Sequence, residues 1–300
     1  MKKYGALILG LALSWQSVEA KTILISDIDD TIKNSHILDL KDKLLSPTYT
    51  ENSVRGMSQI YEIIRRQYAD KGETLPFFYV TNAPWKIMGK IHTSFLSKHG
   101  FPQGAVLFRE DLDNKEHKVE TITELLATEK PDTVIFVGDN GEKDILVYNT
   151  FTSDAKYSNI KFFTYIRMPY YSVENKESLA LLPKQEGFAT SFDLLLSWVN
   201  NGLVDAQKIV SDDKKSKDEI DWSASVENFI VNFTINLADE SETEKHGVLS
   251  FPHWMDCRDV QVPNDSLRNL TDEVKMFAVV ALDTVQKRCS TAARPKVEND

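Results

Sequence analysis

The feature that most constrains the fold is a regular alternation of short apolar segments with longer amphipathic segments between residues 22 and 200. The apolar segments predict β-strands at residues 22–26, 77–80, 105–108, 133–137 and 160–166. The intervening segments have helical spacing of apolar residues at 53–68, 84–100, 119–127 and 192–199. Strands that are apolar throughout are typical of a parallel sheet covered by helices on both faces. We therefore expect an α/β, Rossmann-like fold.

Polar side chains follow three of the predicted strands where the apolar runs end. These side chains are Asp27, Thr81 and Asp139. In open parallel sheets, ligands bind beyond the carboxyl ends of the strands. The sequence therefore predicts a functional site at this edge of the sheet.

The segment 27–31 (DIDDT) places two carboxylates two residues apart just after the first strand. There they can converge on one phosphorus atom, with Asp27 as the nucleophile. Asp29 would be the general acid for the leaving oxygen and later the general base for water. An acidic cluster in this position can equally be a helix cap or a surface turn, and the motif alone does not separate these interpretations.

The segment 138–144 (GDNGEKD) carries Asp139 and Asp144 around a glycine-containing loop. Hard oxygen ligands suit Mg²⁺, which usually keeps several waters and bridges to substrate phosphate. These two aspartates could supply one direct ligand and one water-mediated ligand. The alternative is an ordinary strand-to-helix turn in which Asp139 is a cap.

Two further residues fall where a phosphate site needs them. The hydroxyl of Thr81 can donate a hydrogen bond to a phosphoryl oxygen. Lys118, at the start of a predicted helix, can place a positive charge against the phosphate and reduce repulsion among the aspartates. Lys115 competes for this role, and the position of Lys118 at the helix start favours Lys118.

In this order, the four pieces resemble the haloacid dehalogenase (HAD) superfamily of phosphotransferases. The resemblance implies a HAD-like sheet and a Mg²⁺ ion bound by the side chains of Asp27 and Asp139. It also implies that Asp29 contributes its backbone carbonyl and that Asp144 acts through water. The intervals 32–76 and 82–117 show no separate lid domain, so we expect no large cap domain. An open site suits a phosphate on a large or surface-bound substrate.

The amino-acid sequence in and around the motifs is more similar still to one family. The segments SDIDDTIK, FYVTNAPW, GFP and GDNGEKD resemble the catalytic domain of the actin-patch-type phosphatidate phosphatases, over roughly residues 22 to 170. Arg167 fits the end of that domain. One departure is that the family usually carries Ser-x-Ser-Pro-Trp where this chain has Thr81-Asn82-Ala83-Pro84-Trp85. Threonine keeps the hydroxyl, whereas Asn82 and Ala83 alter the rim of the site.

The resemblance implies a Mg²⁺-dependent phosphomonoester hydrolase with phosphatidate as the favoured substrate. One alternative is a broad-range or soluble-substrate acid phosphatase that acts on nucleotides, sugar phosphates or phosphoproteins. A second is a non-enzymatic binding protein on the same fold, which the intact set of site residues opposes. The net charge of −10 repels nucleic acid at long range, so we expect no nucleic-acid binding. The phosphomonoester substrate could be a phospholipid at a membrane surface. The sequence does not indicate a protein partner.

The two ends of the chain differ from its centre. Residues 1–20 combine a short positive start, an uncharged apolar run and a small-x-small ending at Ala20, which predicts a signal peptide and export to a periplasm or the extracellular space. An uncleaved anchor is the alternative. We expect the phosphatase domain at residues 21–200 and a mostly helical region of unknown role at 201–300.

Three further expectations concern less regular segments. Cys257 and Cys289 could form a disulfide in an exported protein or remain buried thiols. Helices are expected at 222–237 and 265–288, with a mixed charge run at 211–219. The segment 37–50 is either a flap over the site or a loop packed on the sheet edge.

Overall fold

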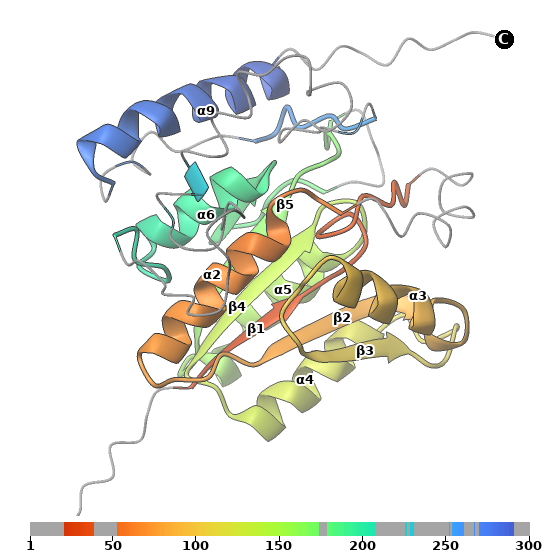
Figure 1. The fold of residues 1–300 in the computed structure, drawn as a ribbon. Helices are drawn as coiled ribbons and strands as arrows, with labels where there is room; N and C mark the ends of the chain where they lie inside the picture. Colours follow the sequence, from red (N-terminus) through yellow and green to blue (C-terminus); the bar gives the residue numbers. More distant parts are fainter. Residues whose placement is uncertain are drawn as a thin grey trace, which may run out of the picture.

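The centre of the molecule is a six-stranded parallel sheet with the strand order β3-β2-β1-β4-β5-β6 (Figure 1). The computed structural model describes residues 21–38, 53–173, 179–207, 226, 229–230, 252, 254–260, 267 and 270–290. The strands are β1 (Thr22–Ser26), β2 (Phe77–Pro84), β3 (Ala105–Arg109), β4 (Thr133–Asp139), β5 (Lys161–Arg167) and β6 (Gln185–Phe188). The predicted α/β fold with a parallel sheet is confirmed.

Helices cover both faces of this sheet. They are α2 (Met57–Asp70), α3 (Trp85–Lys98), α4 (His117–Glu129), α5 (Asp144–Ser153), α6 (Ser191–Asn200) and α9 (Asp272–Ser290), with a short 3₁₀ helix η2 (Ala155–Tyr157). One buried core joins alternate residues of β1 and β4, such as Leu24 and Ile135, to α2 and α6. The other core joins Ile23 and Phe136 to α4 and α5. The alternation of side chains along each strand explains why continuous apolar strands bury both faces.

The sequence pattern does not predict α5 and β6. β6 has the sequence QEGF and lies at the edge of the sheet, where a short strand needs no apolar run. β2 also runs past its predicted end at Val80 to Pro84, with a shift of register against β3 between Thr81 and Pro84. Such a bulge redirects side chains, and here it lies at the predicted site.

Described residues from the last third of the chain pack into the same two cores. Val226, Phe229 and Val274 belong to the α2 and α6 side. Met255 and Cys289 belong to the α4 and α5 side. α9 lies over α6 in Figure 1 and covers most of the helix that the sequence predicts at 265–288.

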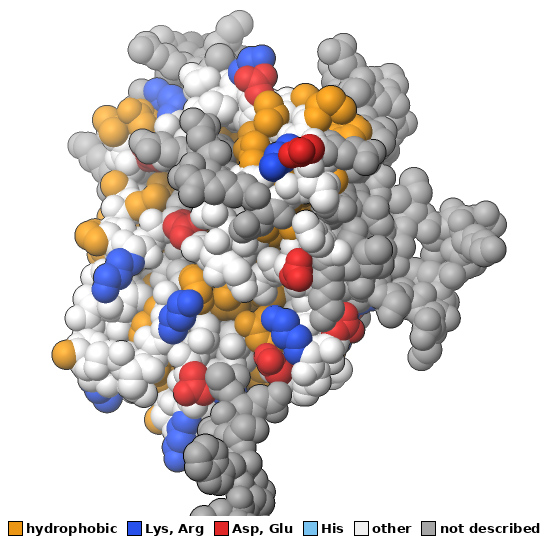
Figure 2. Space-filling view, turned by 90° about the vertical axis from the view of Figure 1, so that its left-hand side faces the viewer, with side chains coloured by type: hydrophobic (Ala, Val, Ile, Leu, Met, Phe, Trp, Pro, Cys, Tyr) orange, Lys and Arg blue, Asp and Glu red, His pale blue; other side chains and the backbone are white. Residues whose placement is uncertain are grey.

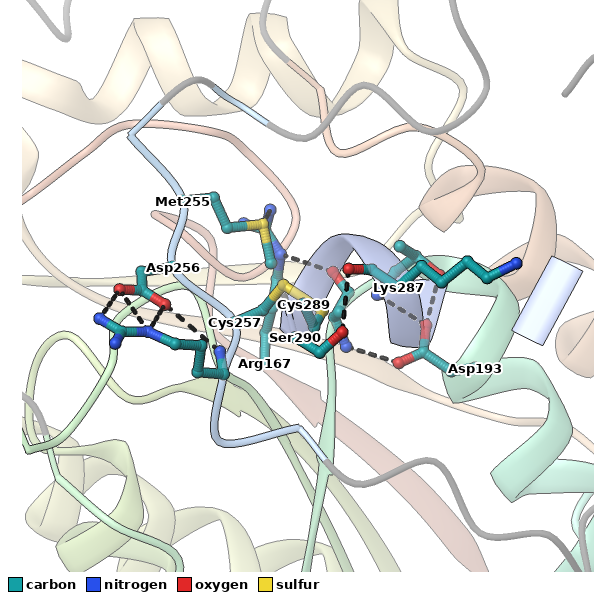
Figure 3. The surroundings of a disulfide bond; sticks show 11 residues. Arg167, Asp193, Met255, Asp256, Cys257, Lys287, Cys289 and Ser290 are labelled. Carbon is teal, nitrogen blue, oxygen red and sulfur yellow. Dashed lines mark hydrogen bonds and ion pairs between the residues drawn. A yellow bond between two sulfur atoms is a disulfide. The ribbon is translucent and has the colours of Figure 1, made fainter. Parts of the chain in front are cut away.

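A disulfide joins Cys257 to Cys289, near the end of α9, with a Cα–Cα distance of 4.8 Å (Figure 3). This outcome decides between the disulfide and the two buried thiols that the sequence left open. The bond ties α9 to the segment 254–260, and Met255 of this segment approaches Arg167 at the end of β5.

Several expectations fall on residues outside the described ranges. These are the signal peptide at 1–20, most of the flap at 37–50, the charge run at 211–219 and most of the helix at 222–237. Within the described parts of the chain, every helix is too short or too polar to cross a membrane. On the face shown in Figure 2, lysine and arginine side chains alternate with aspartate and glutamate, as on an ordinary solvated surface.

Candidate active site

Three aspartates from neighbouring strand ends meet at the carboxyl edge of the sheet. Asp27 follows β1, Asp139 ends β4, and Asp144 begins α5. One carboxylate oxygen from each residue lies within 4.8 Å of the others, and all three residues are buried. Among the described residues these aspartates therefore form a cluster that can bind a metal ion. The sequence placed Asp27 and Asp139 at this edge, and the fold brings Asp144 to them.

Gly138 permits the close approach of Asp144. A Cβ atom at this position would lie 2.6 Å from Oδ2 of Asp144 and 2.7 Å from Cε2 of Tyr148. Any side chain at position 138 would thus push α5 away from β4. The glycine that precedes Asp139 in the motif consequently has a steric role in assembling the cluster.

Thr31, the last residue of the DIDDT segment, connects two of the three carboxylates. Its Oγ1 lies 3.1 Å from Oδ2 of Asp27 and 3.3 Å from Oδ2 of Asp139. A hydroxyl donates one hydrogen bond at a time, so Thr31 can bond to either carboxylate. Thr31 is part of the motif, but its position in the sequence alone predicted no role for it.

Lys118 supplies the positive charge of the cluster. Its Nζ lies 2.8 Å from Oδ1 of Asp27 and 2.5 Å from Oδ1 of Asp144, and the side chain is buried. Burial lowers the pKa of Lys118, but the charges of Asp144 and Asp27 outweigh burial and raise the pKa well above its usual value. Lys115 is exposed. The structure therefore places Lys118, and not its competitor, at the cluster.

One ammonium group does not neutralise three buried carboxylates. Burial raises the pKa of Asp27 despite the opposing charge of Lys118. Burial and the charges of Asp144 and Asp27 likewise raise the pKa of Asp139. A cation bound among these oxygens would favour the ionised carboxylates, and hard oxygen ligands of this kind suit divalent ions such as Mg²⁺. The residues present thus fit a metal site.

Asp29 lies in a second environment beside this cluster. Its Oδ1 accepts a hydrogen bond from Ser35 Oγ at 2.5 Å and lies 3.5 Å from Lys33 Nζ. Its Oδ2 lies 3.3 Å from His92 Nε2. Burial opposes ionisation of Asp29, but the charges of His92 and Lys33 and the hydrogen bond from Ser35 outweigh burial and lower its pKa. No sequence pattern predicted any of these three neighbours.

Thr81 is buried in the bulged part of β2. Its Oγ1 accepts a hydrogen bond from the backbone N–H of Ala83 at 3.0 Å, which leaves its own hydroxyl hydrogen for donation. The next residue, Asn82, donates from Nδ2 to Oε2 of Glu142 at 3.0 Å. Asn82 therefore links the bulged end of β2 to the loop after β4 at the rim of the site.

Asp30 organises the loop that follows the motif. Its carboxylate accepts hydrogen bonds from the backbone N–H groups of Ser35, His36 and Ile37 at 2.7 to 2.8 Å, and from the hydroxyl of Tyr170 at 2.5 Å. Its position between Asp29 and Thr31 in the motif was the only sequence signal for this role.

Arg167 and the segment 254–260 support the same loop from outside. Arg167 donates to the backbone oxygen of Asp30 at 2.7 Å and to Oδ1 of Asn34 at 2.9 Å. The ring of Trp254 stacks on His36, with centroids 4.3 Å apart and planes 5° apart. A part of the chain that carries no catalytic motif is thus in contact with the loop behind the nucleophile.

The comparisons with known proteins agree with this geometry. Residues 22–167 match the family model described as phosphatidate phosphatase APP1, catalytic domain. An uncharacterised protein of Schizosaccharomyces pombe is 24% identical over 142 residues, in a match that covers 42% of this chain and 22% of that relative. The match therefore spans about a fifth of the relative's length.

Two solved structures of the Pnkp1/Rnl/Hen1 complex, one of them described as an RNA repair complex, are also similar. They are 12% and 10% identical, cover 54% and 52% of this chain and 52% and 45% of theirs, and both have a TM-score of 0.34. At this TM-score the similarity supports no conclusion about fold or function. The family match, by contrast, confirms the resemblance carried by the motifs: residues 22–167 match the catalytic domain of a phosphatase family, whose members are phosphoric monoester hydrolases.

Proposed function

We propose that this chain is a Mg²⁺-dependent phosphatase that acts through an aspartyl-phosphate on Asp27, with phosphatidate as its favoured substrate. The observation that carries the proposal is the buried cluster of Asp27, Asp139 and Asp144 around Lys118. Such a cluster stabilises negative charge on a transferring phosphoryl group only when a cation joins it.

The metal would be held by the side chains of Asp27 and Asp139, by the backbone carbonyl of Asp29, and through water by Asp144. When bound, it supplies positive charge against the phosphoryl oxygens. Lys118 keeps a fixed ammonium group against Asp27 and Asp144. The hydroxyl of Thr81 is available for a hydrogen bond to a phosphoryl oxygen.

The reaction proceeds in two steps. A carboxylate oxygen of Asp27 attacks phosphorus, the bond from phosphorus to the ester oxygen breaks, and Asp29 gives its proton to the leaving alcohol. Asp29 then takes a proton from water as the water oxygen attacks phosphorus, which releases phosphate and restores Asp27. The neighbours of Asp29 lower its pKa in the free chain, and the negative charge of a bound phosphate would favour the protonated form that the first step uses.

Phosphatidate is favoured because the family match covers the whole set of motif residues. The name of the Schizosaccharomyces pombe relative, of which the match covers 22%, gives no substrate. Asn82, which departs from the family pattern, lies at the rim and contacts Glu142 rather than the carboxylate cluster. The departure therefore bears on the choice of substrate and not on the chemistry.

The test is Mg²⁺-dependent phosphate release by the purified chain from phosphatidate in mixed micelles and from soluble monoesters, with Asp27→Asn as the control. Preferential release from phosphatidate supports the whole proposal. Release from soluble esters alone overturns the lipid substrate and favours a broad-range phosphatase. Release that does not depend on Asp27 overturns the mechanism.

Export is a separate part of the proposal and rests on residues 1–20 and on the disulfide, which is typical of oxidising compartments. Amino-terminal sequencing of the mature chain from its natural host tests it. A first residue of Lys21 supports export, and a retained Met1 contradicts cleavage.

A further inference from the structure

His92 is a buried histidine for which the proposed mechanism has no role. It lies in the middle of α3, is 0% exposed, and its ring is 5.9 Å from that of Phe108. Neither ring nitrogen has a hydrogen-bond partner of good geometry within the described parts of the chain. Buried polar groups in proteins are almost always hydrogen-bonded, so an exception of this kind calls for a physical reason.

The carboxylate of Asp29 lies close to His92. His92 Nε2 lies 3.3 Å from Asp29 Oδ2, close enough that a small rotation of either side chain would align a hydrogen bond. The other carboxylate oxygen, Oδ1, already accepts a hydrogen bond from Ser35 and lies near Lys33. His92 therefore faces the carboxylate oxygen of Asp29 opposite the one that Ser35 and Lys33 contact.

We propose that His92 is a positioning residue for Asp29, donating an N–H from Nε2 to Oδ2 and fixing the plane of the carboxyl group during proton transfer. This inference rests on the function proposed above. The imidazole supplies the required N–H whether it is neutral or protonated, and His92 keeps this proton in both steps, since the transferred proton moves only between Asp29 and the leaving alcohol or water. Catalytic hydrogen bonds are often long in a free enzyme and shorten when substrate binds.

A pair of substitutions separates positioning from packing. His92→Gln keeps an N–H donor at a similar distance from the backbone, whereas His92→Met fills a similar volume without a donor. His92→Phe keeps a ring against Phe108 and is a second donor-free variant. Thermal unfolding of each variant, measured in parallel, shows whether the fold is kept.

The leaving group provides a readout that a purely structural role does not move. An alkyl phosphate such as a short-chain phosphatidate needs protonation of its leaving oxygen, whereas 4-nitrophenyl phosphate releases a stable anion that needs little general-acid help. Rapid-quench measurement of the first turnover reports the phosphorylation of Asp27 alone for both esters.

We expect His92→Met and His92→Phe to slow the first turnover of the alkyl ester about 10- to 100-fold and that of 4-nitrophenyl phosphate less than about threefold. Release of phosphate from the phosphoenzyme should slow as well, because Asp29 also serves as the base. His92→Gln should recover most of the loss.

Equal slowing of both esters, no slowing of either, or a His92→Gln variant as impaired as His92→Met overturns the inference while the proposed function stands. If the unsubstituted chain releases no phosphate from either ester in a manner that depends on Asp27, the proposed function fails and the inference fails with it.

Discussion

Four aspartates lie at one edge of the sheet, and they occupy two different environments. Asp27, Asp139 and Asp144 are buried within 4.8 Å of one another, and burial raises the pKa of each. Asp29, two residues from Asp27 in the sequence, faces cationic and hydrogen-bonding neighbours, and its pKa is lowered.

Two carboxylates of one short motif are therefore suited to different roles by their surroundings. A crowded cluster with too few positive charges favours binding of a cation. A single carboxylate with Ser35 and Lys33 at one oxygen and His92 near the other is in surroundings suited to a group that transfers protons. The following predictions test this contrast.

Asp27→Asn should have the largest effect. We expect the rate of phosphate release to fall about 10⁴-fold or more, because an amide oxygen cannot form the covalent intermediate. The fold should be kept, because the substitution removes one charge from a repulsive cluster. Initial rates and thermal unfolding measure both effects, with the exposed Asp113→Asn as a matched control. Activity above about one per cent of the parent would refute the nucleophile assignment.

Asp29→Asn should slow turnover about 10²- to 10³-fold, since the nucleophile remains but proton transfer is lost. With 4-nitrophenyl phosphate, the phosphorylated form of Asp27 should accumulate because the base for water is missing. Intact-mass spectrometry after acid quench detects this species. Its absence, together with slow turnover, would place the defect in the first step instead.

The gain in the free energy of unfolding on Mg²⁺ binding should distinguish the two environments. Mg²⁺ at a hundredfold excess over its Kd should raise the free energy of unfolding of the parent by about 2.7 kcal/mol. Asp139→Asn should lose most of this gain, and Asp29→Asn should keep most of it, because Asp29 contributes only a backbone carbonyl. Denaturant unfolding with and without Mg²⁺ measures the gain, and equal losses in both variants would contradict the contrast.

The pH dependence of stability should have opposite signs at the two places. In the unfolded chain, aspartates titrate near about pH 3.9. The pKa of Asp27 is raised in the fold, so its ionisation destabilises the folded, metal-free chain. This destabilisation decreases as pH falls through the folded pKa. The lowered pKa of Asp29 means that its contribution is present above the unfolded pKa and is lost as pH falls through the folded pKa.

Denaturant unfolding of the metal-free chain between pH 4 and pH 7 tests these signs. This range lies above the aspartate pKa of about 3.9 in the unfolded chain. Relative to the parent, Asp27→Asn should be more stable at neutral pH, with a difference that shrinks on acidification. Asp29→Asn should be less stable throughout this range. The same sign for both variants would show that the two environments are not distinct.

The smallest effect on activity should come from the disulfide, which lies behind both environments. Cys257→Ser with Cys289→Ser should lower the free energy of unfolding by about 3–4 kcal/mol for a 32-residue separation. Turnover at low temperature should fall only a few-fold, because Trp254 contacts His36 and Met255 contacts Arg167 rather than the reacting atoms. A loss as large as that of Asp29→Asn would mean that this segment has a direct part in catalysis.

The motif residues could be found without coordinates because each lies at a strand end or a helix start that the apolar pattern locates. Asp27, Thr81 and Asp139 follow apolar runs, and Lys118 begins a helix with a clear periodicity. The partners of Asp29 could not be found in this way. His92 lies within an ordinary helical pattern, 63 positions along the chain from Asp29, and only the packing of α3 against the sheet brings them together.

The sequence by itself determined the parallel sheet, the order of the motifs and the phosphatase family, because periodicity and local motifs are properties of neighbouring residues. Tertiary structure alone decided that Lys118 rather than Lys115 enters the cluster, that Cys257 pairs with Cys289, and that His92 faces Asp29. Each of these outcomes depends on the distance between segments far apart in the chain. That distance is set by how the helices pack on the sheet, which no local pattern encodes.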